Sequence, residues 1–170
     1  QYRIGEAVAA QGSGAVPSEQ RRPALAKLQA GDSVVESNLG AAVSAIARQY
    51  QRLGYAQAKG HGAANEVNAP APGLGLVRPV VSITAGPLTL VGEVRFEGAS
   101  SIPDAQLRPL VTSRPGTPYY EPRIASDREA VVLEYRNRRF ESANLVVSPP
   151  VSADARQAAL PFRLTEGHQT

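Results

Sequence analysis

The sequence predicts an α+β protein in which one small domain occurs twice. Two observations predict this. The chain is similar to itself at a spacing near 86 residues, and each copy passes from alternating apolar residues to a helical apolar spacing and back to alternation. Each copy therefore has the order strand, short helix, long helix, strand, strand. We assign residues 1–88 to the first domain and residues 89–170 to the second.

Prolines and helix positions carry the internal repeat. Pro23 matches Pro109 at a shift of 86 positions, and Tyr50 matches Tyr135 at a shift of 85. Near the end of each copy the shift falls to 81. These changes of shift fall in expected loops, where duplicated domains diverge most readily.

The first strand and the short helix are clearest in the second copy. Val94 and Phe96 alternate with charged residues, which predicts a half-buried strand that Gly98 ends. Pro103-Asp104 then starts a brief helix. Pro109 within it removes a backbone donor, so the helix stays short or distorted.

The long helix begins at Glu121-Pro122, because proline is favoured at the first helical position. Ile124, Val131 and Tyr135 follow at the spacing of one helix face and are expected in the core. The corresponding core face of the first copy is Leu39, Val43, Ile46, Tyr50 and Leu53.

Two strands are expected after this helix. The first covers residues 143–147, and the second alternates through Leu160, Phe162 and Leu164. The last strand should lie centrally, so Pro161 predicts a bulge or a late strand start, because proline cannot donate to a strand ladder.

Two connections differ in their expected mobility. Residues 60–76 of the first copy are rich in Gly, Ala, Asn and Pro, so we expect a mobile loop. Gly86-Pro87 is followed almost at once by the next strand, so this junction should allow only a limited range of angles between the domains.

Composition excludes several classes of protein. Without cysteine, there is no disulfide scaffold, thiol enzyme or Cys-based zinc site. No apolar run approaches the ~18 residues of a membrane-spanning helix. The net charge of +3 is mild and does not by itself argue for nucleic acid. The start at Gln1 suggests a removed targeting segment or excision from a longer protein.

A nucleophilic serine enzyme is disfavoured. Ser33 would need a histidine within hydrogen-bond reach, but the two histidines are His61, in the expected loop, and His168, near the end. Ser33 and Glu36 fit helix capping better. We expect no catalytic residues, no metal site and no cofactor.

Carboxylates on the second long helix have an ordinary interpretation. Glu121, Asp127 and Glu129 share this helix with Arg123 and Arg128. Interspersed opposite charges on a helix are typical of a solvated, ion-paired face rather than of acid–base catalysis.

A basic cluster, Arg136, Arg138 and Arg139, lies at the end of the same helix. It can stabilise the helix dipole or contact an anionic partner. The element order also resembles the start of the KH RNA-binding fold, so an RNA-binding tandem is the alternative function. The helix–helix connections, residues 30–35 and 114–119, lack the second glycine of the KH loop, and no nucleic-acid partner is expected.

The order βααββ, repeated without a linker, resembles tandem POTRA (polypeptide-transport-associated) domains of outer-membrane assembly factors of the BamA/TamA type. In the second copy the similarity lies in residues 91–98, Leu107, Leu110, Gly116, Tyr119, Tyr120, Ile124, Asp127, Tyr135, Phe140 and residues 162–167. In the first copy it lies in Gly31, Leu39, Tyr50, Gly54, Tyr55 and residues 81–86. Arg139 stands where the pattern has glycine, so we expect that corner to be built differently.

The resemblance implies a non-enzymatic scaffold on the periplasmic side of the outer membrane, as a soluble part of a longer protein with a C-terminal membrane barrel. Each domain would be a three-stranded mixed sheet covered by two helices, with the first strand after the long helix outermost. An unfolded outer-membrane polypeptide would pair with that edge, and periplasmic or lipoprotein subunits would dock as partners. The predicted edge residues are Tyr55, Gln57, Lys59, Ala143, Asn144, Leu145, Val146 and Val147.

Overall fold

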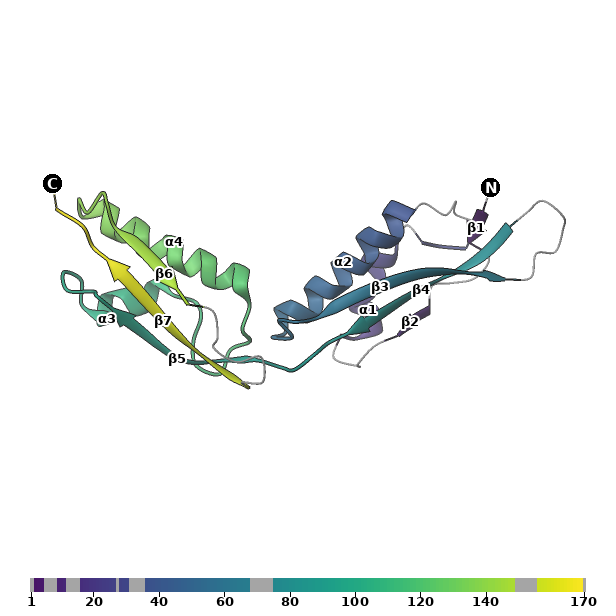
Figure 1. The fold of residues 1–170 in the computed structure, drawn as a ribbon, viewed down its shortest axis with the longest axis horizontal. Coiled ribbons are helices and arrows are strands. Elements are labelled where there is room, and N and C mark those ends of the chain that lie inside the picture. Colours follow the sequence, from purple (N-terminus) through teal and green to yellow (C-terminus); the bar gives the residue numbers. More distant parts are fainter. Residues whose placement is uncertain are drawn as a thin grey trace. The chain divides into compact units, whose positions relative to one another are not determined.

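The computed structural model describes residues 2–4, 9–11, 16–26, 28–30, 36–67, 75–148 and 156–169. The chain forms two compact units (Figure 1). Unit one comprises Gln1–Gln51 and Gln57–Gly86, and unit two comprises Arg52–Ala56 and Pro87–Thr170. The predicted α+β tandem is therefore confirmed, while a domain boundary exactly between residues 88 and 89 stays a prediction.

The described residues of unit one form one long helix, a short α-helix continued by a 3-10 helix, and four strands. In chain order these are β1 (Tyr2–Ile4), β2 (Ala9–Gln11), α1 (Ser18–Arg21), η1 (Arg22–Leu25), α2 (Glu36–Arg52), β3 (Lys59–Val67) and β4 (Gly75–Thr84). β3 pairs antiparallel with β4 along one edge, and β1 and β2 pair in parallel with successive stretches of β4. Within the residues that the structure describes, two short strands thus stand where a single first strand was predicted, and the sheet contains four strands rather than three.

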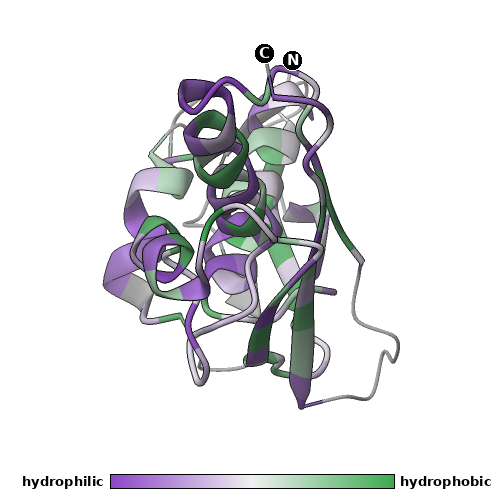
Figure 2. Cartoon of the chain, turned by 90° about the vertical axis from the view of Figure 1, so that its left-hand side faces the viewer, coloured by the Kyte–Doolittle hydropathy of each residue, from purple (hydrophilic) through white to green (hydrophobic). Residues whose placement is uncertain are grey.

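Helix α2 packs the predicted face against the sheet. Leu39, Ile46 and Tyr50 are buried and Val43 is partly buried. Leu53 was wrongly placed in the core, because α2 ends at Arg52 and Leu53 is 40% exposed. Figure 2 shows that the helices carry both hydrophilic and hydrophobic residues. In α2 the buried residues recur at the spacing of one helix face.

The expected mobile loop of unit one is largely a hairpin. β3 and β4 pair continuously from Lys59 opposite Thr84 to Val67 opposite Leu76, so the loop prediction was wrong for 60–67 and 75–76. Residues 68–74 lie outside the described residues. The composition suggested a loop, but Gly62 here allows α2 to pack closely on the strand, because a Cβ on Gly62 would lie 2.8 Å from Leu39 Cγ.

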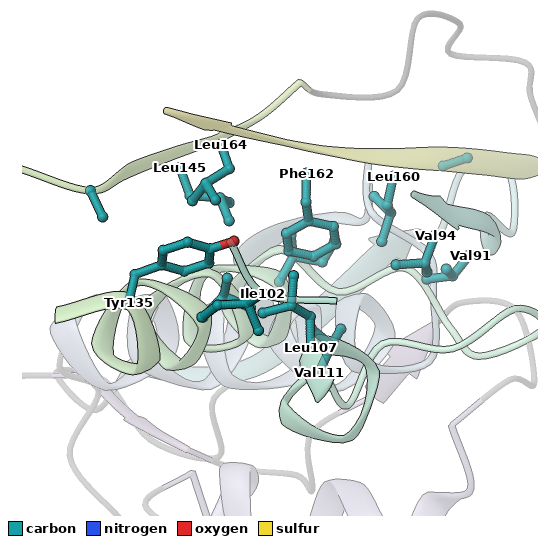
Figure 3. Close-up of a cluster of buried hydrophobic side chains, with 14 of the residues drawn as sticks. Val91, Val94, Ile102, Leu107, Val111, Tyr135, Leu145, Leu160, Phe162 and Leu164 are labelled. Carbon is teal, nitrogen blue, oxygen red and sulfur yellow. The ribbon is translucent and has the colours of Figure 1, made fainter. Parts of the chain in front are cut away.

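Unit two has the predicted three-stranded mixed sheet. Its elements are β5 (Leu90–Glu97), α3 (Asp104–Leu107), η2 (Arg108–Leu110), α4 (Glu121–Asn137), β6 (Asn144–Val147) and β7 (Gln157–Thr165). β7 is central, parallel to β5 and antiparallel to β6. Buried side chains from both layers meet between the sheet and the helices, with Tyr135, Leu107 and Phe162 among them (Figure 3).

Pro161 lies within the central strand, as expected, but β7 does not start late. β7 begins at Gln157, and the pairing with β6 reaches only as far as Phe162 opposite Val147. Pro161 is therefore one residue beyond that pairing. An irregularity of register does occur, in β5 between Val91 and Val94. The sheet thus tolerates the missing donor at Pro161.

Asp127 corrects the interpretation of the helix carboxylates. It is not part of a solvated face, because only 2% of the residue is exposed. Its Oδ1 accepts hydrogen bonds from the Thr112 N–H and hydroxyl, both at 2.7 Å, and its Oδ2 accepts one from the Ser113 N–H at 2.8 Å. The carboxylate thereby ties α4 to the connection after η2.

A second carboxylate, Glu166, ties the end of β7 to the loop after β5. Its oxygens accept hydrogen bonds from the Ser100 and Ser101 N–H groups at 2.6 and 2.7 Å, and from the Ser101 hydroxyl at 2.8 Å. The Tyr135 hydroxyl donates to it at 3.1 Å. Burial opposes ionisation, but the hydrogen bonds from Ser101 and Ser100 outweigh it and hold the pKa of Glu166 below its ordinary value.

Candidate functional site

β6 is an edge strand, as the resemblance implied. Among the described residues its only pairing is with β7, with Asn144 opposite Thr165 and Val147 opposite Phe162. No other strand in the described part of unit two lies against its outer side. This leaves a strand edge of the kind that can accept an additional strand.

The backbone direction along β6 follows from the central strand. A Cβ on Gly98, just after β5, would overlap the carbonyl oxygen of Leu164, so this carbonyl points towards β5. Backbone N–H and C=O of one strand residue point to the same side, and the sides alternate along the strand. Leu145, opposite Leu164, therefore directs both groups away from β7.

The same alternation gives the direction of the backbone groups of the other residues of β6. Val147 also directs its backbone groups outward, whereas Asn144 and Val146 direct theirs to β7. Ala143 lies just before the strand, and its N–H already donates to the Phe140 carbonyl at 3.1 Å. The outer edge available for pairing is thus centred on Leu145 and Val147.

The side chains of β6 alternate between the two faces of the sheet. Leu145 is buried in the core and Val147 is partly buried, while Asn144 is exposed and Val146 is 53% exposed. The residues with outward backbone groups therefore hold the strand on the core, and an incoming strand does not need to displace them.

A groove runs between this edge and α4, with a volume of about 590 Å³. The strand side of the groove is formed by Ala143, Asn144 and Leu145, and the helix side by Arg128, Glu129, Val132, Leu133 and Arg136. Leu133 is 59% exposed and so offers apolar surface to the groove. The groove offers apolar surface and charge of both signs next to the strand edge.

Sequence reasoning missed the helix side of this groove. Arg128, Val132 and Arg136 recur every four residues and so form one row on α4, next to Glu129 and Leu133. The spacing was readable, but only the position of β6 shows that this row borders the strand edge.

The structure separates the three predicted basic residues. Arg136 lines the groove. Arg138 instead donates from Nε to Glu134 Oε1 at 2.8 Å and from an Nη to Gln106 Oε1 at 2.7 Å. Only Arg136 therefore lies with the strand edge.

Arg139 forms the helix end that was expected to be built differently. It takes a φ of 70°, the left-handed conformation usually adopted by glycine. Its N–H donates to the Arg136 carbonyl at 2.9 Å, and the Phe140 N–H donates to the Tyr135 carbonyl at 3.0 Å. This is a Schellman helix end, so the expectation was wrong and arginine accepts the strained conformation.

In unit one the edge was placed too early. Tyr55 and Gln57 lie before β3, and only Lys59 of the three predicted residues is within the strand. The internal repeat aligns Tyr55 with Phe140, at a shift of 85 residues. The same shift aligns Lys59, where β3 begins, with Asn144, where β6 begins, so the repeat alone would have placed the start of β3 correctly. Where the structure describes unit one, β3 pairs only with β4. Helix α2 lies close to β3, because a Cβ on Gly60 would be 2.5 Å from Val43 Cγ1.

Two further features bear on the chemistry of the chain. In the part that the structure describes, no three His, Asp or Glu side chains gather where a metal ion could be held. Among the same residues, no helix combines the length and apolar character needed to span a membrane.

The geometry defines a class of protein: a tandem of small α+β modules, each with a strand edge beside a long helix. The particular family follows from comparison. Residues 89–167, which make up most of unit two, match the family model described as "POTRA: Surface antigen variable number repeat". The resemblance found in the sequence is confirmed.

Solved structures show the same fold across both units. POTRA3-5 of Haemophilus influenzae BamA is 20% identical, with a TM-score of 0.58, over 97% of this chain and 61% of that one. POTRA1-2 of the periplasmic domain of Anabaena Omp85 is 18% identical, with a TM-score of 0.54, over 99% of this chain and 98% of that one.

A third structure, Haemophilus ducreyi BamA lacking POTRA domains 1-3, is 18% identical with a TM-score of 0.60 over 96% of this chain and 29% of that one. The chain thus spans less than two thirds of either BamA chain. No curated protein matches the sequence at a significant level.

Proposed function

We propose that the chain is a non-enzymatic scaffold of an outer-membrane assembly or translocation factor, acting on the periplasmic side of the membrane. It would bind unfolded outer-membrane polypeptides by adding one of their strands to β6. The observation that carries the proposal is the outer edge of β6, where Leu145 and Val147 direct their backbone groups away from the sheet next to an open groove.

Backbone pairing suits a client of variable sequence. A strand added to β6 gains hydrogen bonds to the N–H and C=O groups of Leu145 and Val147, and these groups exist in every polypeptide. Each bond contributes about 0.5–1.5 kcal/mol net. Pairing with two residues therefore gives only a few kcal/mol before ordering costs, which corresponds to weak and readily reversible binding.

The groove adds a preference for side chains. Alternate residues of an added strand would face α4, where Val132 and Leu133 offer apolar contact. Arg128, Glu129 and Arg136 border the same groove, so polar residues of either charge can be accepted at its rim. A strand with alternating apolar and polar residues, as in a membrane barrel, fits this surface.

Partner subunits and the membrane barrel of the parent protein are proposed to contact the chain elsewhere. The outer helical faces remain accessible when a client occupies β6. A series of truncated chains tests this. Some truncations should abolish partner binding while client-peptide binding is kept, and loss of both kinds of binding in every such truncation would contradict separate surfaces.

The experiment uses a photocrosslinking residue at Asn144 and a peptide of one barrel strand as the probe. Val147→Pro removes an outward N–H, whereas the control Val147→Ala removes most of the side chain and keeps the N–H. Crosslinking should fall strongly in Val147→Pro and persist in Val147→Ala. Crosslinking that survives in a folded Val147→Pro chain would rule out edge addition.

A further inference from the structure

A second groove lies at the opposite edge of the same sheet. It is formed where β5 faces η2 and the connection that follows η2, and its volume is about 370 Å³. Val94 and Phe96 line it from β5, and Pro109, Val111 and Pro115 line it from the other side. Because β7 separates β5 from β6, this groove is independent of the proposed client site.

The size and lining of the groove favour a small apolar group. Binding pockets for small molecules have volumes of about 300–1,000 Å³, so this groove is at the lower end of that range. Phe96 packs against the buried Phe162 with ring centroids 5.4 Å apart, which fixes this part of the lining. One or two apolar side chains of a partner would fill the space.

A buried hydroxyl in the groove lacks a hydrogen bond. Ser113 lines the groove and is only 3% exposed. Its N–H donates to Asp127, but its Oγ has no hydrogen-bond partner. An unsatisfied buried polar group costs free energy. A bound group that reaches the Oγ after rotation of the buried Ser113 side chain would therefore gain a favourable hydrogen bond.

The charged residues of the groove are both basic. Arg108 and Arg114 line it, and no acidic side chain does. Arg108 has one long contact, 3.6 Å to Asp104, and both partners are well exposed to solvent. Glu93 of β5 also feels the charge of Arg108, but its closest partner is Arg95 at 2.6 Å. The rim is therefore complementary to a carboxylate.

We propose that this groove, named here the β5 groove, binds an acidic peptide segment of a partner protein. A leucine- or phenylalanine-sized side chain would enter between Phe96 and Val111, and a neighbouring carboxylate would pair with Arg108 and Arg114. The Ser113 hydroxyl would donate to an oxygen of the same segment. The site is distinct from the client edge, so both can be occupied at once.

The test is an NMR titration of the 170-residue chain with N-acetyl-Asp-Leu-Asp amide, and with N-acetyl-Lys-Leu-Lys amide as the charge-reversed probe. The acidic probe should shift the amide signals of Phe96 and Ser113, and the basic probe should not. Equal shifts with both probes, or none at these residues with the acidic probe, would overturn the proposal.

Two sets of variants locate the binding. Arg108→Gln with Arg114→Gln should weaken the acidic probe at least tenfold, whereas the matched pair Arg128→Gln with Arg136→Gln, in the other groove, should leave it unchanged. Ser113→Ala should lower affinity about fivefold without unfolding the chain, because its hydroxyl has no partner in the free protein. Unchanged affinity in the Arg108/Arg114 variant would contradict the assigned site, and unchanged affinity in Ser113→Ala would contradict the role of the hydroxyl.

Discussion

Asp127 and Thr112 are joined by two hydrogen bonds of 2.7 Å, from the Thr112 N–H and hydroxyl to one carboxylate oxygen. The other oxygen accepts the Ser113 N–H at 2.8 Å. A carboxylate in the middle of α4 thus fixes the chain that leads from η2 towards α4. The same contact orders Ser113, which lines the β5 groove.

Removing this carboxylate should destabilise unit two. Asp127→Ala leaves the buried Ser113 N–H and the N–H of Thr112 without an acceptor, and such losses cost about 1–3 kcal/mol each. We expect the free energy of unfolding of unit two to fall by about 2–4 kcal/mol, measured in urea from resolved amide signals. Glu129→Ala on the exposed side of α4 should change it by less than about 0.5 kcal/mol. If Asp127→Ala lowers the free energy of unfolding no more than Glu129→Ala does, the stabilising role of the Asp127 hydrogen bonds is contradicted.

Glu166 should make unit two sensitive to acid. Because its pKa is lowered in the folded state, its contribution is complete above the unfolded pKa of about 4.3 and is lost as the pH falls through the folded value. The difference in the free energy of unfolding between the wild type and Glu166→Gln should therefore become smaller as the pH falls below about 4.3. Urea unfolding at a series of pH values measures this gap, and a gap independent of pH would contradict the assignment.

Arg139→Gly should stabilise the protein. Arg139 has a φ of 70°, which costs a residue with a Cβ about 1–2 kcal/mol and costs glycine far less. We expect a gain near 1 kcal/mol in the free energy of unfolding, reduced by glycine's greater freedom in the unfolded chain. Arg138→Gly should instead lower the free energy of unfolding, because Arg138 has a φ of −94°, where glycine relieves no strain, and because its contacts with Glu134 and Gln106 are lost. A loss of stability in Arg139→Gly would contradict this account.

Replacement by alanine should have opposite effects on stability at two glycines of unit one. A Cβ on Gly62 would lie 2.8 Å from Leu39 Cγ and 3.0 Å from Val43 Cγ2, so Gly62→Ala should cost about 1–3 kcal/mol. A Cβ on Gly40, inside α2, meets nothing within 4 Å. Gly40→Ala should stabilise by about 0.5–1 kcal/mol, since alanine favours the helix. Thermal unfolding followed by circular dichroism checks both, and a neutral Gly62→Ala would contradict the close helix packing.

Much of the fold could be predicted because each apolar spacing indicated a single type of element and the side of it that is buried. Tyr135 at the helical spacing from Ile124 and Val131 had to share their buried face, and all three do. Alternation through Leu160, Phe162 and Leu164 likewise placed the core side of β7. The edge position of β6 required the family resemblance, because strand order depends on contacts between distant residues.

The errors arose where a residue's role depends on a distant partner. In the sequence Asp127 cannot be distinguished from an exposed helix carboxylate. Only the structure shows that Thr112 and Ser113 lie beside it and donate hydrogen bonds to it. Gly60 and Gly62 resemble loop residues until α2 lies on their strand. The groove beside β6 was missed for the same reason, since α4 and β6 supply one side each.

The central claim is that the outer backbone groups of β6 pair with a client strand. Amide hydrogen exchange of the chain, with and without a barrel-strand peptide, measures this at single residues. The account predicts slower exchange at Leu145 and Val147 when the peptide binds, with little change at Val146, whose N–H already faces β7. Unchanged exchange at Leu145 and Val147 with saturating peptide would contradict it.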